Sequence, residues 1–465
     1  MNTIKKILLF TAVVSVFSCK KELDIAPTDV FDETKAYLSV DDLQRGLNTA
    51  YARVAPESKI MANAACSDEV RFGPDNAGQF QFEYRLQYGS DGVSAGSTDD
   101  MWGSNYGMVD QINRVLEAFP NVPSVGATDD ARKNTIRGQL LALRAYAHFE
   151  LLQAYSKKYG ASETGVPIMT ISDLLGQPAR KSSGEVIGQI ENDLATARGL
   201  LTAPTAATFN DLFINQITVD AISARVALYK GDFAAAKTAA TNVINSAVRP
   251  LVSGATFAGI WTDANLSSEV LFRLKRGGQS VGANFTTTTN QVYLSPSNKL
   301  TALYAASDVR GTAYIATVGG KRVVNKYYTS AAGARINDIK EIRTAEMYLI
   351  RAEAAARRNT GTDFADATAD LNTLRAARIT GYVPAAFPDQ ATLMAAVMEE
   401  RLKELCFEGH RFYDLKRNGM DMQRLASDVD SPNWQSLSAS SHRFVFPIPG
   451  SEILANPNCV QNPNY

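Results

Sequence analysis

The chain has 465 residues, of which 45% are hydrophobic and 20% charged, and its formal net charge is −1. This composition is ordinary for a globular protein, and the length leaves room for two lobes. Because there is no basic excess, nucleic acid is not expected as a partner. No internal apolar run reaches the length of a membrane-spanning helix.

The N-terminal residues differ from the rest of the chain. Two lysines precede an apolar stretch over residues 7–17, which is too short to span a bilayer and predicts a signal peptide over residues 1–18. The next residue, Cys19, ends a segment that resembles a lipoprotein cleavage box. Acyl chains on Cys19 would anchor the protein to a membrane, with residues 19–38 as the lipidated tether. A plain secreted protein is the alternative.

Three further cysteines are present, at Cys66, Cys406 and Cys459. If Cys19 carries lipid, these three cannot all pair with one another. No CxxC pair occurs, so a zinc site is not indicated, and no cofactor or metal is expected. Cys406 lies on an apolar helical stripe and is expected to be a small buried residue. A disulfide between Cys66 and Cys459 stays open.

Three helices with apolar faces are predicted in the first third of the chain, over residues 39–54, 102–119 and 131–155. Ser39 is the expected N-cap of the first helix, with Asp42 completing a capping box. The third helix alternates small alanines with leucines and aromatic residues, as closely packed helix pairs do.

Two stretches, 221–246 and 348–377, share one pattern of helix, tight turn and helix. Each turn carries Asp followed by Phe, and each second helix has an early alanine, Ala236 or Ala367. Small residues there let paired helices approach, as in the tetratricopeptide repeat; two unrelated helical hairpins are the alternative. Further pairs are predicted between 39–54 and 102–119, between 131–155 and 184–199, and between 392–408 and 410–417.

Residues 56–100 and 250–340 interrupt the helical pattern with aromatic residues set among Gly, Thr, Ser and Asn. Residues 269–272 read as a strand, and the alternating rings of residues 80–84 suggest one side of a strand or extended loop. Rings on loops suit sugars, because a ring face stacks on sugar C–H groups while polar neighbours bind hydroxyls; each ring could equally fill a core. The candidate ligand-binding residues are Phe72, Phe80, Phe82, Tyr84, Tyr88, Trp261, Tyr293, Tyr314 and Tyr327.

Residues 400–419 combine an apolar helical stripe with charges of alternating sign, and Gly409 is a plausible end of the helix. Four side chains here could donate or accept protons. They form either a catalytic acid/base cluster or a helix corner held by buried, paired charges. Alternating charge and the absence of metal-ligand spacing favour the corner. The groups concerned are Glu404, Glu408, His410 and Asp414.

This stretch resembles the C-terminal hallmark of the SusD/RagB family, the surface glycan-binding lipoproteins of Bacteroidetes. The family carries a pattern close to E-R-R-x-E-L-x-F-E-G-x-R-x-x-D-L-x-R, which residues 400–417 follow. A second family hallmark resembles residues 446–465, FPIPGSEILANPNCVQNPNY. Shorter resemblances lie at Leu23-Asp24, just after the lipidation site, and over residues 102–113. In the family, both C-terminal hallmarks are fold markers and not the sugar site.

The resemblance implies a mainly α fold of about four tetratricopeptide-like helix pairs with large loop insertions. It would form one SusD-like domain over residues 39–465, with an insertion lobe at about 250–340. The helical repeats would lie around 39–54, 102–155, 184–246 and 341–417.

The resemblance also implies a protein that is not an enzyme and is lipid-anchored at the outer membrane, on the cell surface. It would capture oligosaccharides and pass them to a SusC-like TonB-dependent transporter, with no nucleic-acid partner. The alternatives are a helical-repeat assembly scaffold, capture of a non-glycan nutrient, or a surface glycoside hydrolase. A hydrolase needs two positioned carboxylates, and 48 acidic residues supply pairs by chance.

Overall fold

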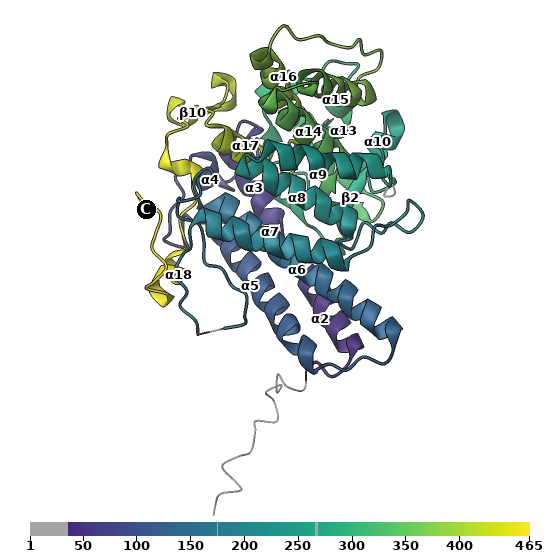
Figure 1. Cartoon of the computed structure of the whole chain (residues 1–465). Coiled ribbons are helices and arrows are strands. Elements are labelled where there is room, and N and C mark those ends of the chain that lie inside the picture. The colour runs from purple at the N-terminus through teal and green to yellow at the C-terminus, as the bar shows by residue number, and fades with distance from the viewer. Residues whose placement is uncertain (1–35, 174, 266–267) are drawn as a thin grey trace, which may run out of the picture.

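The computed structural model describes residues 36–173, 175–265 and 268–465 (Figure 1). The predicted signal peptide, the lipidation site Cys19 and nearly all of the tether lie outside the described residues. Within them the fold is mainly helical, as the sequence predicts, and none of their helices is long and apolar enough to cross a membrane.

The main helices follow the predicted pairs. They are α2 (Val40–Ala52), α3 (Glu57–Cys66), α5 (Ser97–Ala118), α6 (Ala127–Tyr155), α7 (Ser183–Leu200), α8 (Gln216–Lys230), α9 (Phe233–Ser246), α14 (Thr344–Arg358), α15 (Asp363–Arg378), α16 (Gln390–Leu405) and α17 (Arg411–Asn418). Shorter helical pieces are α4 (Gln81–Tyr84), η2 (Phe119–Asn121), α10 (Gly254–Trp261), α11 (Val281–Phe285), α12 (Asn298–Thr301), α13 (Val309–Tyr314), η3 (Asn325–Tyr327), η4 (Ala426–Asp428), η5 (Pro432–Trp434), η6 (His442–Phe444) and α18 (Gly450–Ala455).

Consecutive helices lie against one another from α5 to α9, and α9 packs in turn on α14 (Figure 1). The predicted pairs α2 with α5, α6 with α7, α8 with α9, α14 with α15 and α16 with α17 are all in contact. Ala236 in α9 and Ala367 in α15 are fully buried, which fits their predicted role of letting paired helices approach.

Local capping explains where several helices begin and end. Ser39 accepts the N–H of Asp42 while the Asp42 carboxylate accepts the N–H of Ser39, so the predicted capping box is confirmed. Asp232 caps α9 through the N–H of Ala235. Helix α16 ends at Leu405, earlier than Gly409, and the turn that follows places both Phe407 and Gly409 at positive φ.

The region from 56 to 100 is more helical than the sequence indicated. Helix α3 occupies a stretch expected to be irregular, and the alternating rings at Phe80, Phe82 and Tyr84 lie on and beside the short helix α4. The prediction of an extended segment there is therefore wrong. A helix as short as α4 is set by its tertiary surroundings, because a single turn is not stable alone.

The strands are short and form two-stranded antiparallel sheets. They are β1 (Val70–Phe72) with β3 (Leu294–Pro296), β2 (Val270–Leu274) with β8 (Ile339–Arg343), β4 (Ile315–Val318) with β5 (Lys321–Val324), β6 (Thr329–Ser330) with β7 (Gly333–Ala334), and β9 (Met422–Gln423) with β10 (Ser436–Leu437). Strand β2 confirms the strand expected near residues 269–272. The β1–β3 sheet joins the two aromatic-rich regions of the chain.

The three described cysteines are free thiols, and all three are buried. Cys66 and Cys459 therefore do not form the disulfide that the sequence left open. Cys406 is fully buried beside α16, as predicted. Burial raises the pKa of the Cys406 thiol to about 12, so this group remains protonated and acts as an apolar packing residue.

Candidate functional site

The acidic residues of the α16–α17 corner are buried and paired with cations. Glu404 is fully buried and accepts hydrogen bonds from Arg310 at 3.1 Å, Arg343 at 2.8 Å and Arg378 at 3.0 Å. Burial opposes its ionisation, but the charges of Arg378, Arg343 and Arg310 outweigh burial and hold the pKa of Glu404 well below its usual range. An acid held in its ionised form is a poor proton donor.

The other two carboxylates of this corner are paired in the same way. Glu408 accepts from Lys326 Nζ at 2.6 Å, and Asp414 accepts from Arg401 Nε at 2.8 Å. Burial and the nearby cations, Arg225 and Lys59 first among them, hold the pKa of His410 well below its usual range. The corner is therefore a buried network of ion pairs, which is the interpretation that the sequence favoured over a catalytic cluster.

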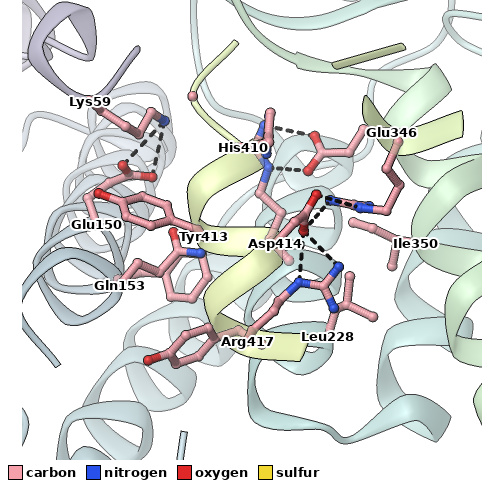
Figure 2. Close-up of a pocket in the computed structure, with 15 residues that line it drawn as sticks. Lys59, Glu150, Gln153, Leu228, Glu346, Ile350, His410, Tyr413, Asp414 and Arg417 are labelled. Carbon is pink, nitrogen blue, oxygen red and sulfur yellow. Dashed lines mark hydrogen bonds and ion pairs between the residues drawn. The ribbon is translucent and has the colours of Figure 1, made fainter. Parts of the chain in front are cut away.

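A small cavity lies beside this network (Figure 2). Its walls include the Lys59–Glu150 pair, at 3.3 Å, and Asp414 with its partner Arg417. The cavity volume is about 30 Å³, which is room for a single water molecule and not for a sugar. The charged groups that line it therefore do not form a site for an organic substrate in this structure.

The structure divides the nine aromatic candidates into two groups by burial. Five have at most 1% of their surface exposed, so their ring faces are closed to a ligand and they are core residues, contrary to the prediction of a binding role. Lys326 Nζ, for example, lies 4.4 Å from the ring centre of Trp261 and 3.7 Å from that of Tyr314. The five are Tyr84, Tyr88, Trp261, Tyr314 and Tyr327.

The other four candidates, Phe72, Phe80, Phe82 and Tyr293, are half-buried, and the β1–β3 sheet connects their two regions. The N–H of Gly73 donates to the Tyr293 carbonyl at 2.9 Å. A Cβ atom at Gly73 would lie 2.1 Å from the Val292 carbonyl oxygen, so only glycine permits this close backbone approach.

Trp434 in η5 is also half-buried, and it was not among the residues predicted from the sequence. The Arg85 guanidinium lies 4.6 Å from the Trp434 ring centre and 5.9 Å from that of Phe72, so it bridges the two rings. The buried Arg424 fixes the segment by donating to the Trp434 carbonyl at 2.7 Å. The available signal was a lone tryptophan in the Ser-rich, non-periodic stretch 430–441.

We call Phe72, Phe80, Phe82, Tyr293 and Trp434 the aromatic face. Polar groups lie among these rings: Asp75 pairs with Lys321 at 2.7 Å, and Arg85 donates to Gln81 at 3.2 Å. Partly exposed rings with polar neighbours can stack on the C–H face of a sugar and bind its hydroxyls. Within the described residues, no group of His, Cys, Asp and Glu side chains has a geometry suited to a metal ion.

Two family models match the chain. The one described as "SusD family" matches residues 262–465, and the one described as "Starch-binding associating with outer membrane" matches residues 24–228. SusD-like protein P2 of Formosa agariphila is 24% identical, over 99% of both chains. The starch-binding protein SusD of Bacteroides thetaiotaomicron is 35% identical, over 28% of this chain and 22% of its own.

Solved structures share the fold over nearly the whole chain. A SusD superfamily protein from Bacteroides thetaiotaomicron has a TM-score of 0.80 and 26% identity, and the match covers 92% of this chain and 100% of that one. A putative sugar-binding protein from Bacteroides vulgatus has a TM-score of 0.79 and 26% identity, over 92% of this chain and 99% of that one.

Proposed function

Because the chain belongs to the SusD/RagB family, we propose that it captures oligosaccharides at the cell surface and delivers them to a SusC-like TonB-dependent transporter in the outer membrane. The single observation that carries the proposal is the aromatic face. It comprises half-buried rings at residues 72–82, Tyr293 and Trp434, which are far apart in the sequence. Arg85 links the rings of Phe72 and Trp434, and the backbone of Gly73 pairs with that of Tyr293.

In this proposal the protein binds and does not catalyse. The half-exposed rings stack on the sugar, and the nearby Gln81, Asp75 and Lys321 offer an amide, an acceptor and a donor to its hydroxyls. The acids of the α16–α17 corner, which the sequence offered as a possible catalytic cluster, are paired with cations, as Glu404 is with three arginines. The models and relatives named for starch and sugar binding support the same ligand class.

The proposed location is the outer membrane, with acyl chains on Cys19 as the anchor. Acyl chains hold a protein on a membrane without a spanning helix, and the family model described as associating with the outer membrane supports this location. Metabolic labelling with a fatty-acid analogue, in cells that express the full-length protein, tests this anchor. We expect label in the wild-type protein and none in Cys19→Ser; label in both proteins would contradict the anchor.

Calorimetric titration of residues 36–465 with plant, host and microbial oligosaccharides tests the capture role. We expect Tyr293→Ala and Trp434→Ala to lower affinity for a bound glycan about tenfold each, the loss expected for one stacking contact of roughly 1.4 kcal/mol. Tyr382→Ala is the matched control, because Tyr382 is also half-buried but belongs to the loop between α15 and α16. Equal losses in all three variants, or no glycan bound by folded protein, would contradict the proposal.

Delivery to a transporter is tested separately. Tagged full-length protein should co-purify from outer membranes with a TonB-dependent transporter, and Trp434→Ala should co-purify equally well if the aromatic face binds only sugar. Capture of glycan without any transporter partner would limit the function to binding.

A further inference from the structure

A second pocket, separate from the aromatic face, carries a concentration of positive charge. It has a volume of about 630 Å³ and lies where the chain leaves α6, where α17 ends and where the C-terminal segment passes. We call it the lysine pocket. It is lined by Lys157, Lys158, Lys416, Gly419, Ala439, Ser440, Ser441, His442, Phe444, Val445, Asn462, Pro463 and Asn464. No carboxylate side chain is among these lining residues, and none of them belongs to the aromatic face.

Two of the three lysines have no carboxylate partner within the described part of the chain. Lys157 pairs with Glu163 at 3.3 Å, whereas Lys158 is exposed and makes no ion pair there. A Cβ atom at Gly419 would lie 4.0 Å from Lys158 Nζ, which places this ammonium over the end of α17. Lys158 is therefore a cation that is open to a ligand.

Lys416 reaches the pocket from α17 and is 5% exposed. Its ammonium donates to the carbonyls of Gln153 and Ser156, at 3.0 Å for Ser156, and an ammonium has three donors. Burial lowers the pKa of Lys416 to about 7, because no anion offsets the loss of water. An anion bound beside it would supply the missing counter-charge.

The rest of the lining offers neutral donors and apolar surface. His442 Nε2 is buried without a hydrogen-bond partner, and such orphaned groups call for a ligand or a water. Ser440 and Ser441 contribute hydroxyls, and Asn462 and Asn464 contribute amides, while Phe444 and Val445 add apolar area. The volume lies within the range of small-molecule sites and exceeds what an inorganic anion needs.

We propose that the lysine pocket binds the carboxylate or sulfate group of an acidic sugar, with Lys158 and Lys416 as its charge partners and the serine and asparagine side chains as donors to its hydroxyls. This is a second ligand site, and it goes beyond capture at the aromatic face. It gives the protein a preference for charged glycans that stacking alone cannot supply, because every sugar has an apolar face.

The test titrates the folded protein with four probes: a uronic-acid trisaccharide, a sulfated disaccharide, a neutral trisaccharide and sodium sulfate. We expect an acidic sugar to bind, and Lys158→Gln to weaken that binding about tenfold, the value of one charge-assisted hydrogen bond. Lys275→Gln is the matched control, because Lys275 is exposed but does not line the pocket, and it should bind as the wild type does. Thermal melting confirms that both variants fold.

The outcomes separate the two sites. Trp434→Ala should keep its affinity for the acidic group, so loss of glycan capture at the aromatic face leaves this proposal standing. The proposal is overturned if no acidic sugar binds, or if Lys158→Gln binds as tightly as Lys275→Gln. If sodium sulfate bound as tightly as the sulfated disaccharide, the pocket would be a site for free anions, and the claim that it recognises a sugar would be overturned.

Discussion

The α16–α17 corner and the aromatic face are both rich in side chains that could bind a ligand, and they differ in what those side chains already contact. At the corner, Glu404 alone accepts from Arg310, Arg343 and Arg378, and the cavity beside this network has a volume of about 30 Å³, too small for a sugar. The acidic groups of the corner are therefore already paired, largely with cations from other elements that pack on it.

The aromatic face is the reverse case. Its rings come from β1, α4, the segment before β3 and η5, and all five are partly exposed, with Arg85 between Phe72 and Trp434. The corner holds the strongest sequence motif and the face holds none. In this protein the motif therefore marks residues that contact one another in the core. A binding surface needs only side chains that are still open to a ligand, and no motif marks them.

Breaking the corner should have the largest effect. Glu404→Ala leaves three buried arginines without their shared carboxylate, so we expect the free energy of unfolding to fall by about 5 kcal/mol. Denaturant unfolding monitored by circular dichroism measures it. Glu399→Ala is the matched control on the same helix, because Glu399 is exposed, and it should change stability by less than about 0.5 kcal/mol. Similar losses in both variants would contradict the comparison.

Trp261 and Tyr293 were both predicted from the sequence to bind ligand, but their substitutions should have different effects on stability and binding. Trp261 is 1% exposed, so Trp261→Ala should cost about 4 kcal/mol of stability through the cavity it leaves. Tyr293→Ala should leave the melting temperature nearly unchanged while weakening glycan binding. Parallel melting and titration of the two variants check this. If Trp261→Ala were as stable as the wild type but no longer bound glycan, Trp261 would be a ligand-binding residue after all.

The corner should also respond to acid through Glu353, which accepts from Arg417 at two distances of 2.6 Å. Burial opposes its ionisation, but Arg417, Arg401 and Arg357 lower the pKa of Glu353 from 4.5 to about 2. Its contribution is therefore full above pH 4.5 and is lost as the pH falls toward 2, by roughly 3 kcal/mol in total.

In Glu353→Gln, the free energy of unfolding should depend less on pH than in the wild type. Unfolding free energies of the wild type and Glu353→Gln, measured at several pH values between 7 and 3, give the two slopes. The variant is expected to be less stable at neutral pH and to lose less on acidification. Equal slopes for the two proteins would show that this carboxylate is not held ionised by its arginines.

The smallest expected effect is at the aromatic face itself. Arg85→Ala removes the cation between Phe72 and Trp434 and should cost roughly 0.5–1 kcal/mol of stability, because the contact is partly exposed. Glycan affinity should fall about threefold, since the Trp434 ring loses its support. Calorimetry and the fluorescence of the tryptophans measure the two changes; unaltered affinity would show that Arg85 does not position Trp434.

The sequence by itself determined the helical class, the helix pairs and the interpretation of the α16–α17 corner. Helical spacing and caps such as Ser39 are local, and the alternating charges of residues 400–417 favoured ion pairing over catalysis. The partners of Glu404, however, are Arg310, Arg343 and Arg378, which lie outside that stretch and which only the fold brings to it. The family resemblance rests on the same local motifs, so it could be recognised from the sequence before the structure was known.

Only the tertiary structure decided which rings face the solvent. Tyr84 and Phe82 are two residues apart, yet one is fully buried and the other half-exposed, because α4 turns them to different sides. Trp434 contacts Arg85, about 350 residues away by their numbers, and its segment is fixed by Arg424. Exposure depends on contacts between distant segments, and no local pattern of the chain records those contacts.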